Sequence, residues 1–221
     1  MKEDQNSFYE DVKDGIRDEV DKVKLTTTSL LAMATRLRQS TSLPSILTSN
    51  DISNIKIERT CELVDEIIKN DDKVVIFSSY KDVIKELESK LNNYNVVTGT
   101  GDTNDNILSN NIDKFQNDPN TKVFLGTWQR CGTGLTLTAA SYMIFIDTPW
   151  TDAQFQQSCD RIYRIGTTKP VFIYVLICNN TIDERVYEII NTKRAISDYI
   201  IDDTITQEGL NSLKKYIEDL K

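Results

Sequence analysis

Five short runs of apolar, mostly β-branched residues alternate with helix-like segments in the middle of the chain, and this alternation constrains the fold most strongly. The runs lie at residues 73–79, 95–99, 122–127, 142–147 and 171–177. Their apolar side chains occupy consecutive positions, which is typical of strands buried on both faces of a parallel sheet. Because strands and helices alternate, the sequence predicts a layered α/β domain with helices covering the sheet.

Helical periodicity flanks the strand-rich region. Residues 5–38 place apolar side chains three or four positions apart. The first half of this segment carries enough charge to form a protruding arm or a solvated helix. Asp51 or Ser53 can cap a further helix that ends near Lys69. We expect a helical insertion or arm at residues 1–50, an α/β lobe at 51–203 and a peripheral C-terminal helix at 204–221.

Composition excludes several kinds of chemistry. The chain has no histidine, which removes Ser-His-Asp and Cys-His catalysis and all His-ligated metal sites. The four cysteines form no CxxC pair, so we expect reduced structural thiols and no metal site. A net charge of -8 argues against a general polyanion-binding surface, so DNA contact requires a local track. The acidic N-terminus and the lack of a long apolar run favour a cytoplasmic protein without membrane contact.

Two arginines three positions apart belong to the most informative polar segment, QSCDRIYRIG at residues 157–166, called the arginine block below. On a helix, Gln157, Arg161 and Arg164 share one polar stripe, while a second, apolar stripe contains Phe155, Cys159 and Ile162. Guanidinium groups in this arrangement suit the equatorial oxygens of a transferred phosphoryl group. The alternative is an ordinary surface ion pair between Asp160 and Arg164.

A glycine-rich segment, GTWQRCGTGLTLTAA at residues 126–140, follows the third predicted strand and is called the glycine loop below. Glycines at a strand end let the backbone approach a phosphate closely, and hydroxyls are natural partners for phosphate oxygens, here Thr127, Thr133 and Thr136. The segment is not a Walker A loop, because the 221 residues contain no GxxxxGK[ST]. The alternative is a tight turn into a helix.

A lone GxG at residues 99–101 follows the second predicted strand. It lacks the third glycine of a dinucleotide fingerprint, and we interpret it as a turn. A dinucleotide-binding domain would also need an acidic residue at the end of the next strand. Residues 122–127 offer none there.

Taken in order, these segments resemble the C-terminal RecA-like lobe of SNF2-family, superfamily 2 DNA-dependent ATPases. The resemblance covers roughly residues 30–200. The matching segments are LRQ with a nearby proline (37–44), an IFSQ-like motif IV (75–79), Val-Thr-Gly (97–99), motif V (131–140), motif Va (145–150), motif VI (157–166), a VxVYRLI-like strand (171–177) and a TIEE-like helix start (181–185).

The resemblance implies a RecA-like parallel sheet flanked by helices, which is a P-loop NTPase-like second lobe, with helical N-terminal and C-terminal extensions. It implies that Arg161 and Arg164 are arginine fingers for ATP, which a first lobe of the same protein would hold together with Mg²⁺. The other implied positions in the ATP cleft are Gln157, Gly132, Gly134 and Asp160. Contacts to the backbone of double-stranded DNA are implied at Ser78, Ser79, Thr127 and Thr133.

The implied function is the second motor lobe of an ATP-dependent DNA translocase or helicase. A non-catalytic docking or nucleic-acid-binding module with vestigial motifs is the alternative. Because no Walker A lysine is present, we expect the chain alone to bind ATP weakly and to hydrolyse essentially none. The sequence departs from the family pattern at Thr151, Asp152, Phe155 and Thr167, and it lacks the family's arginine beyond Gly99.

Overall fold

The computed structural model describes residues 1–20, 26–131, 134–163, 170–194 and 207–220. Within these ranges, no helix is both long enough and apolar enough to cross a membrane. The chain divides into a helical unit (residues 1–56, 150–152 and 177–221) and a sheet unit (residues 57–149 and 153–176). Both ends of the chain, and three residues in its middle, therefore belong to the helical unit.

The sheet unit is built on five parallel strands in the order β2-β3-β1-β4-β5. They are β1 (Val74–Ser78), β2 (Asn95–Gly99), β3 (Thr121–Thr127), β4 (Tyr142–Phe145) and β5 (Phe172–Val175). Each of the five predicted runs forms one of these strands. Neighbouring parallel strands need crossover connections, and the intervening helices supply most of them. The predicted α/β fold with a RecA-like parallel sheet is confirmed.

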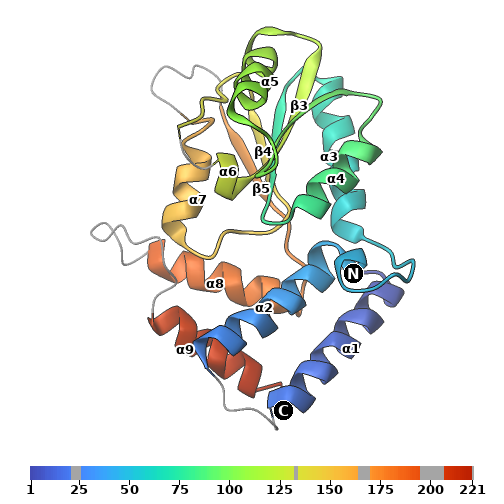
Figure 1. The fold of residues 1–221 in the computed structure, drawn as a ribbon, viewed down its shortest axis with the longest axis vertical. Helices are drawn as coiled ribbons and strands as arrows, with labels where there is room; N and C mark the ends of the chain where they lie inside the picture. Colours follow the sequence, from blue (N-terminus) through green and yellow to red (C-terminus); the bar gives the residue numbers. More distant parts are fainter. Residues whose placement is uncertain (21–25, 132–133, 164–169, 195–206, 221) are drawn as a thin grey trace. The chain divides into compact units, whose positions relative to one another are not determined.

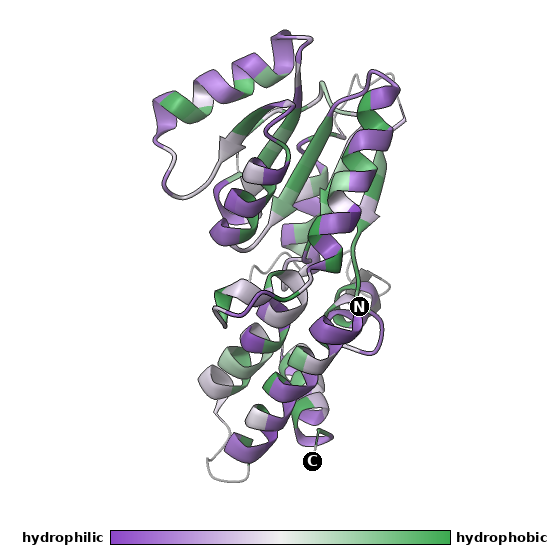
Figure 2. Cartoon of the chain, turned by 90° about the vertical axis from the view of Figure 1, so that its right-hand side faces the viewer, coloured by the Kyte–Doolittle hydropathy of each residue, from purple (hydrophilic) through white to green (hydrophobic). Residues whose placement is uncertain are grey.

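Apolar side chains of the central strands form the core of the sheet unit. β1 is buried along its whole length, and Phe77, Phe124 and Phe145 pack in one cluster with Phe155. The sheet appears as a green, apolar layer between helices with purple outer faces in Figure 2. The helices of this unit are α3 (Ile55–Lys69), α4 (Lys81–Lys90), α5 (Asp105–Asn117), α6 (Trp128–Cys131) and α7 (Asp152–Cys159), of which α3 and α7 start in the helical unit (Figure 1).

The edge strand β5 departs from the expected burial on both faces. Phe172, Ile173 and Tyr174 are 47%, 41% and 38% exposed. The ring of Tyr142 on β4 stacks against Phe172, with ring centroids 5.1 Å apart. An edge strand has a sheet neighbour on one side only, so its apolar sequence predicts a strand correctly but overstates the burial.

The helical unit has its own apolar core. Its helices are α1 (Glu3–Val20), α2 (Thr27–Ser42), the short 3₁₀ helix η1 (Pro44–Ile46), α8 (Ile182–Arg194) and α9 (Gln207–Glu218). Tyr9 and Ile16 of α1 are fully buried in one cluster with Leu37, Ile182 and Leu213. The charged α1 is therefore a packed helix and not a solvated one. The predicted domain boundaries at residues 50 and 203 stay predictions.

A buried glutamine caps the start of α3. The Gln5 side chain accepts a hydrogen bond from the Ile55 amide at 3.1 Å and donates one to the Thr41 carbonyl at 3.2 Å. Ser53, one of the two predicted caps, instead donates its own amide to the Asp4 carboxylate at 2.7 Å. The orphan amide of a helix start is thus satisfied by a residue that local sequence patterns do not reveal.

Candidate functional site

The carboxyl ends of β1, β3 and β4 meet at one edge of the sheet, where ligands of open α/β sheets bind. Ser78 and Thr127 end β1 and β3 and are register partners, and Asp147 follows β4 by two residues. The buried Asp147 carboxylate accepts hydrogen bonds from the Ser78 hydroxyl at 2.5 Å, from the Ser79 amide at 3.0 Å and from the Ser79 hydroxyl. The Asp147 carboxylate therefore links the carboxyl ends of β1 and β4 at this edge.

The two serines predicted to contact DNA differ in exposure. Ser78 is fully buried, and its hydroxyl oxygen also accepts a hydrogen bond from the Tyr80 amide at 3.1 Å. Ser79 is half-buried, and its hydroxyl accepts a hydrogen bond from the Trp128 indole at 2.9 Å. Thr127 is 4% exposed. Among these three residues, the Ser79 side chain is the most accessible to a phosphate.

Two glycines near this edge make room for the Cys131 side chain. A Cβ atom added at Gly99 or at Gly126 would lie 2.9 Å or 2.8 Å from the Cys131 Sγ. The Cys131 thiol donates a hydrogen bond to the Gly99 carbonyl at 3.2 Å. These glycines therefore allow close packing of α6, which is a different role from the phosphate approach expected of the glycine loop.

Among the described residues of the glycine loop, Gly134 has a backbone conformation that residues with a side chain rarely adopt. Its φ is +74°, and a Cβ atom added there would meet nothing within 4 Å. The obstacle to substitution is therefore conformational and not steric. Gly132 and Thr133, which the sequence assigned to the cleft and to DNA contact, lie outside the described residues.

Two buried thiols predict a loss of stability at alkaline pH. Burial raises the pKa of Cys131 to about 12 and that of Cys178 to about 11, from ordinary values of 9.0. A raised folded-state pKa gives stability that is complete below pH 9 and is lost as the pH rises towards 11 or 12. Denaturant titrations at pH 8, 9.5 and 10.5 should show unfolding free energies that change little up to pH 9 and then fall by up to about 1.4 kcal/mol per pH unit for each thiol. The Cys131→Ser/Cys178→Ser variant should fall less steeply, and an equal fall in both proteins would contradict this assignment.

Arg161 connects the arginine block to the glycine loop. Its Nε donates a hydrogen bond to the Gln157 carbonyl at 2.8 Å, and one terminal nitrogen donates to the Leu135 carbonyl at 3.3 Å. In return, the Arg161 carbonyl accepts from the Leu137 amide at 2.8 Å. The structure therefore brings together two segments that the sequence selected independently.

The apolar side of the arginine block lies as predicted. Phe155, Cys159 and Ile162 are buried in the core of the sheet unit, and the Phe155 ring stacks on Phe145 with centroids 4.8 Å apart. The predicted helix is shorter than expected, because α7 ends at Cys159 and Arg161 lies in the turn that follows. That turn exposes Asp160. Arg164, the second predicted finger, lies outside the described residues.

The GxG segment forms a turn, as predicted. The Thr103 amide donates to the Thr100 carbonyl at 2.9 Å, and Asp102 forms an exposed ion pair with Lys81 at 2.9 Å. The segment therefore gives no support to a dinucleotide site.

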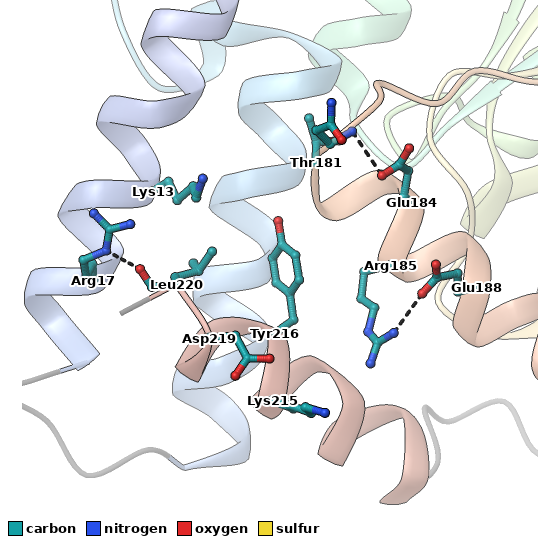
Figure 3. A pocket seen from close by; sticks show the side chains of 11 residues that line it. Lys13, Arg17, Thr181, Glu184, Arg185, Glu188, Lys215, Tyr216, Asp219 and Leu220 are labelled. Carbon is teal, nitrogen blue, oxygen red and sulfur yellow. Dashed lines mark hydrogen bonds and ion pairs between the residues drawn. The ribbon is translucent and has the colours of Figure 1, made fainter.

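A pocket of about 570 Å³ lies within the helical unit, between α1, α8 and α9. Figure 3 shows Tyr216 between the charged residues that line this pocket. The pocket is lined by none of the residues that the sequence assigned to a site. The charged side chains are of both signs, namely Lys13, Arg17, Arg185 and Lys215 with Glu184, Glu188 and Asp219. This mixture favours no one class of ligand.

The described residues fit a nucleotide only in part. Arg161 retains a terminal nitrogen without a bond to any described residue, so it can donate to a phosphate oxygen. Across the described part of the chain, no three acidic, cysteine or histidine side chains gather closely enough to hold a metal ion. A triphosphate would need further donors from elsewhere.

The helicase conserved C-terminal domain matches residues 55–166, which is half of the chain. An uncharacterized ATP-dependent helicase of Mycoplasma pneumoniae is 29% identical over 209 residues, which cover 93% of this chain and 20% of the relative. The chain thus spans about one fifth of the length of such curated relatives.

Two solved structures from Sulfolobus solfataricus are similar. The SWI2/SNF2 ATPase core domain is 27% identical with a TM-score of 0.80, covering 99% of this chain and 47% of the other. The same core in complex with dsDNA is 26% identical with a TM-score of 0.75, covering 96% of this chain and 48% of the other. The chain belongs to the family of helicase conserved C-terminal domains. Within that family it is a C-terminal lobe of the SNF2 type.

Proposed function

We propose that this chain is the second motor lobe of an ATP-dependent translocase that acts on double-stranded DNA. The observation that carries this proposal is the similarity, over 96% of the chain, to a SWI2/SNF2 ATPase core in complex with dsDNA. A first lobe would hold ATP with its Mg²⁺, because the 221 residues contain no Walker A sequence.

In this proposal, Arg161 and Arg164 stabilise the charge that develops on the transferred phosphoryl group. Supporting this role, the Arg161 guanidinium is held by the Gln157 and Leu135 carbonyls, which limits its rotamer freedom before a nucleotide arrives. Gln157, Gly132, Gly134 and Asp160 would line the same cleft. The contact from Arg161 to the glycine loop offers a route from nucleotide to DNA track.

The DNA track in this proposal runs along the carboxyl ends of β1 and β3. Ser79 is the preferred phosphate contact because it is the accessible hydroxyl there, and Thr127 and Thr133 would extend the track. Ser78 is buried, so we assign it a supporting role through Asp147. Contacts to phosphates carry no sequence information, so movement would be independent of DNA sequence.

Displacement of a third strand from a DNA triplex tests the proposal. The chain joined to its first lobe should release the triplex-forming strand when ATP is present and should retain it with a non-hydrolysable ATP analogue. Equal release in both conditions, or none in either, would contradict a translocase.

A further inference from the structure

The Ser79 hydroxyl lies between two groups with fixed hydrogen-bond roles. The Trp128 indole Nε1 lies 2.9 Å from Ser79 Oγ, and that hydroxyl is also hydrogen-bonded to Asp147 Oδ1. The Ser79 amide donates to the same carboxylate at 3.0 Å. Trp128 is 7% exposed and Asp147 is 2% exposed, so both partners of the half-buried Ser79 are shielded from water.

Donor and acceptor chemistry fixes the direction of these hydrogen bonds. An indole N–H can only donate, and an ionised carboxylate can only accept. The Ser79 oxygen therefore accepts from Trp128 while its single proton goes to Asp147. A DNA phosphate also only accepts, so Ser79 can serve it only by turning that proton away from Asp147.

This rotation leaves the other hydrogen bonds in place. Ser79 Oγ can keep the bond from Trp128, because a hydroxyl oxygen has lone pairs besides its proton. Asp147 keeps the bond from the Ser78 hydroxyl at 2.5 Å and the bond from the Ser79 amide. A hydrogen bond from Trp128 to the hydroxyl oxygen also polarises the Ser79 O–H group. This polarisation strengthens the hydrogen bond that the hydroxyl donates.

We propose that Trp128 is a positioning residue for DNA binding, holding Ser79 Oγ in place while the Ser79 hydroxyl proton turns from Asp147 Oδ1 towards a phosphate oxygen. The proposal rests on the proposed function, in which Ser79 contacts the DNA backbone. It assigns Trp128 a purpose beyond its place in the apolar cluster of the sheet unit. Asp147 is then the resting acceptor when DNA is absent.

Double-variant measurements separate this role from simple packing. The 221-residue chain would be titrated against labelled double-stranded DNA at low salt, as wild type, Trp128→Phe, Ser79→Ala and the double variant. Each single variant should weaken binding by about 2- to 10-fold, as expected for one hydrogen bond. The double variant should bind no more weakly than Ser79→Ala alone, because the indole then has no hydroxyl to hold.

Salt dependence and the second tryptophan provide the controls. A neutral hydroxyl releases no counterions, so the slope of affinity against salt should be the same in all four proteins. Trp150→Phe, which changes the chain's other tryptophan, should leave DNA affinity unchanged. In that background the indole N–H of Trp128 gives a single NMR signal, which should shift when DNA is added and should exchange faster in Ser79→Ala.

The outcomes distinguish a failure of the Trp128 role from a failure of the proposed DNA track. Additive losses of DNA affinity in the double variant, or an indole signal that does not shift when DNA is added, would overturn the positioning role of Trp128. Neither result would contradict the proposed DNA track. No binding by wild type would overturn the track itself, and the positioning role with it. If Trp128→Phe fails to fold, the indole signal in the Trp150→Phe chain still decides the matter.

Discussion

Replacing Arg164 by alanine is expected to lower ATP turnover by about 10³- to 10⁵-fold in the protein that contains both lobes, the range seen for loss of an arginine finger. The cause is the loss of a guanidinium that would neutralise charge on the transferred phosphoryl group. DNA affinity should stay nearly unchanged, because the proposed role of Arg164 is in the nucleotide cleft and not in the DNA track. Steady-state turnover and DNA titration of the same preparation measure both quantities.

Two further arginine variants sharpen this test. Arg59→Ala is the matched control, since Arg59 is exposed and forms a surface ion pair with Glu62 at 2.8 Å. It should retain wild-type turnover. Arg161→Ala should lose turnover and should also loosen the glycine loop, because it removes the hydrogen bond to the Leu135 carbonyl. Equal loss of turnover and DNA affinity in Arg164→Ala would show that the finger is misassigned.

Replacing Lys56 by methionine is expected to destabilise the helical unit by about 3–5 kcal/mol. The Lys56 ammonium lies 2.7 Å from the Asp183 carboxylate, and both side chains are almost fully buried. Asp183 also accepts hydrogen bonds from the Thr41 hydroxyl at 3.0 Å and the Cys178 amide at 3.1 Å. Methionine keeps the length of the lysine stem but leaves the buried carboxylate without its counter-charge. Urea unfolding followed by circular dichroism measures the difference.

The surface pair of Lys81 and Asp102 provides the matched control. Both of its side chains are largely exposed, so Lys81→Met should cost less than about 1 kcal/mol. Adding Asp183→Asn to Lys56→Met should recover part of the lost stability, because it removes the uncompensated charge. Similar losses in Lys56→Met and Lys81→Met would show that the buried pair contributes no more than a surface pair.

The sequence predicted the sheet because burial and strand propensity agree there. Val74 to Ser78 of β1 are buried on both faces, so a continuous apolar run was the correct signal. The fully buried Tyr9 and Ile16 of α1 were harder to foresee, since the charged residues around them suggested a solvated helix. What buries them is contact with α2, α8 and α9, which come from both ends of the chain, and periodicity carries no information about such partners.

The candidate site could also be predicted only in part, because some of its contacts depend on tertiary structure. The arginine block and the glycine loop were recognised from spacing, and the contact between Arg161 and Leu135 joins them. Asp147 lies within the segment that resembles motif Va (145–150), but the sequence pattern did not assign it to the site. Its signal was a carboxylate just after a buried strand, but the strand order that brings it to Ser78 and Ser79 is a tertiary property. The link from Trp128 to Ser79 likewise depends on β1 and β3 being neighbours.

The most direct test of the motor assignment is the rate of ATP hydrolysis by the protein that joins this chain to its first lobe, measured with and without double-stranded DNA. The account predicts turnover that DNA stimulates, and essentially no turnover by the 221-residue chain alone. Absence of turnover in the joined protein, with DNA bound, would contradict the account and would favour a docking module with vestigial motifs.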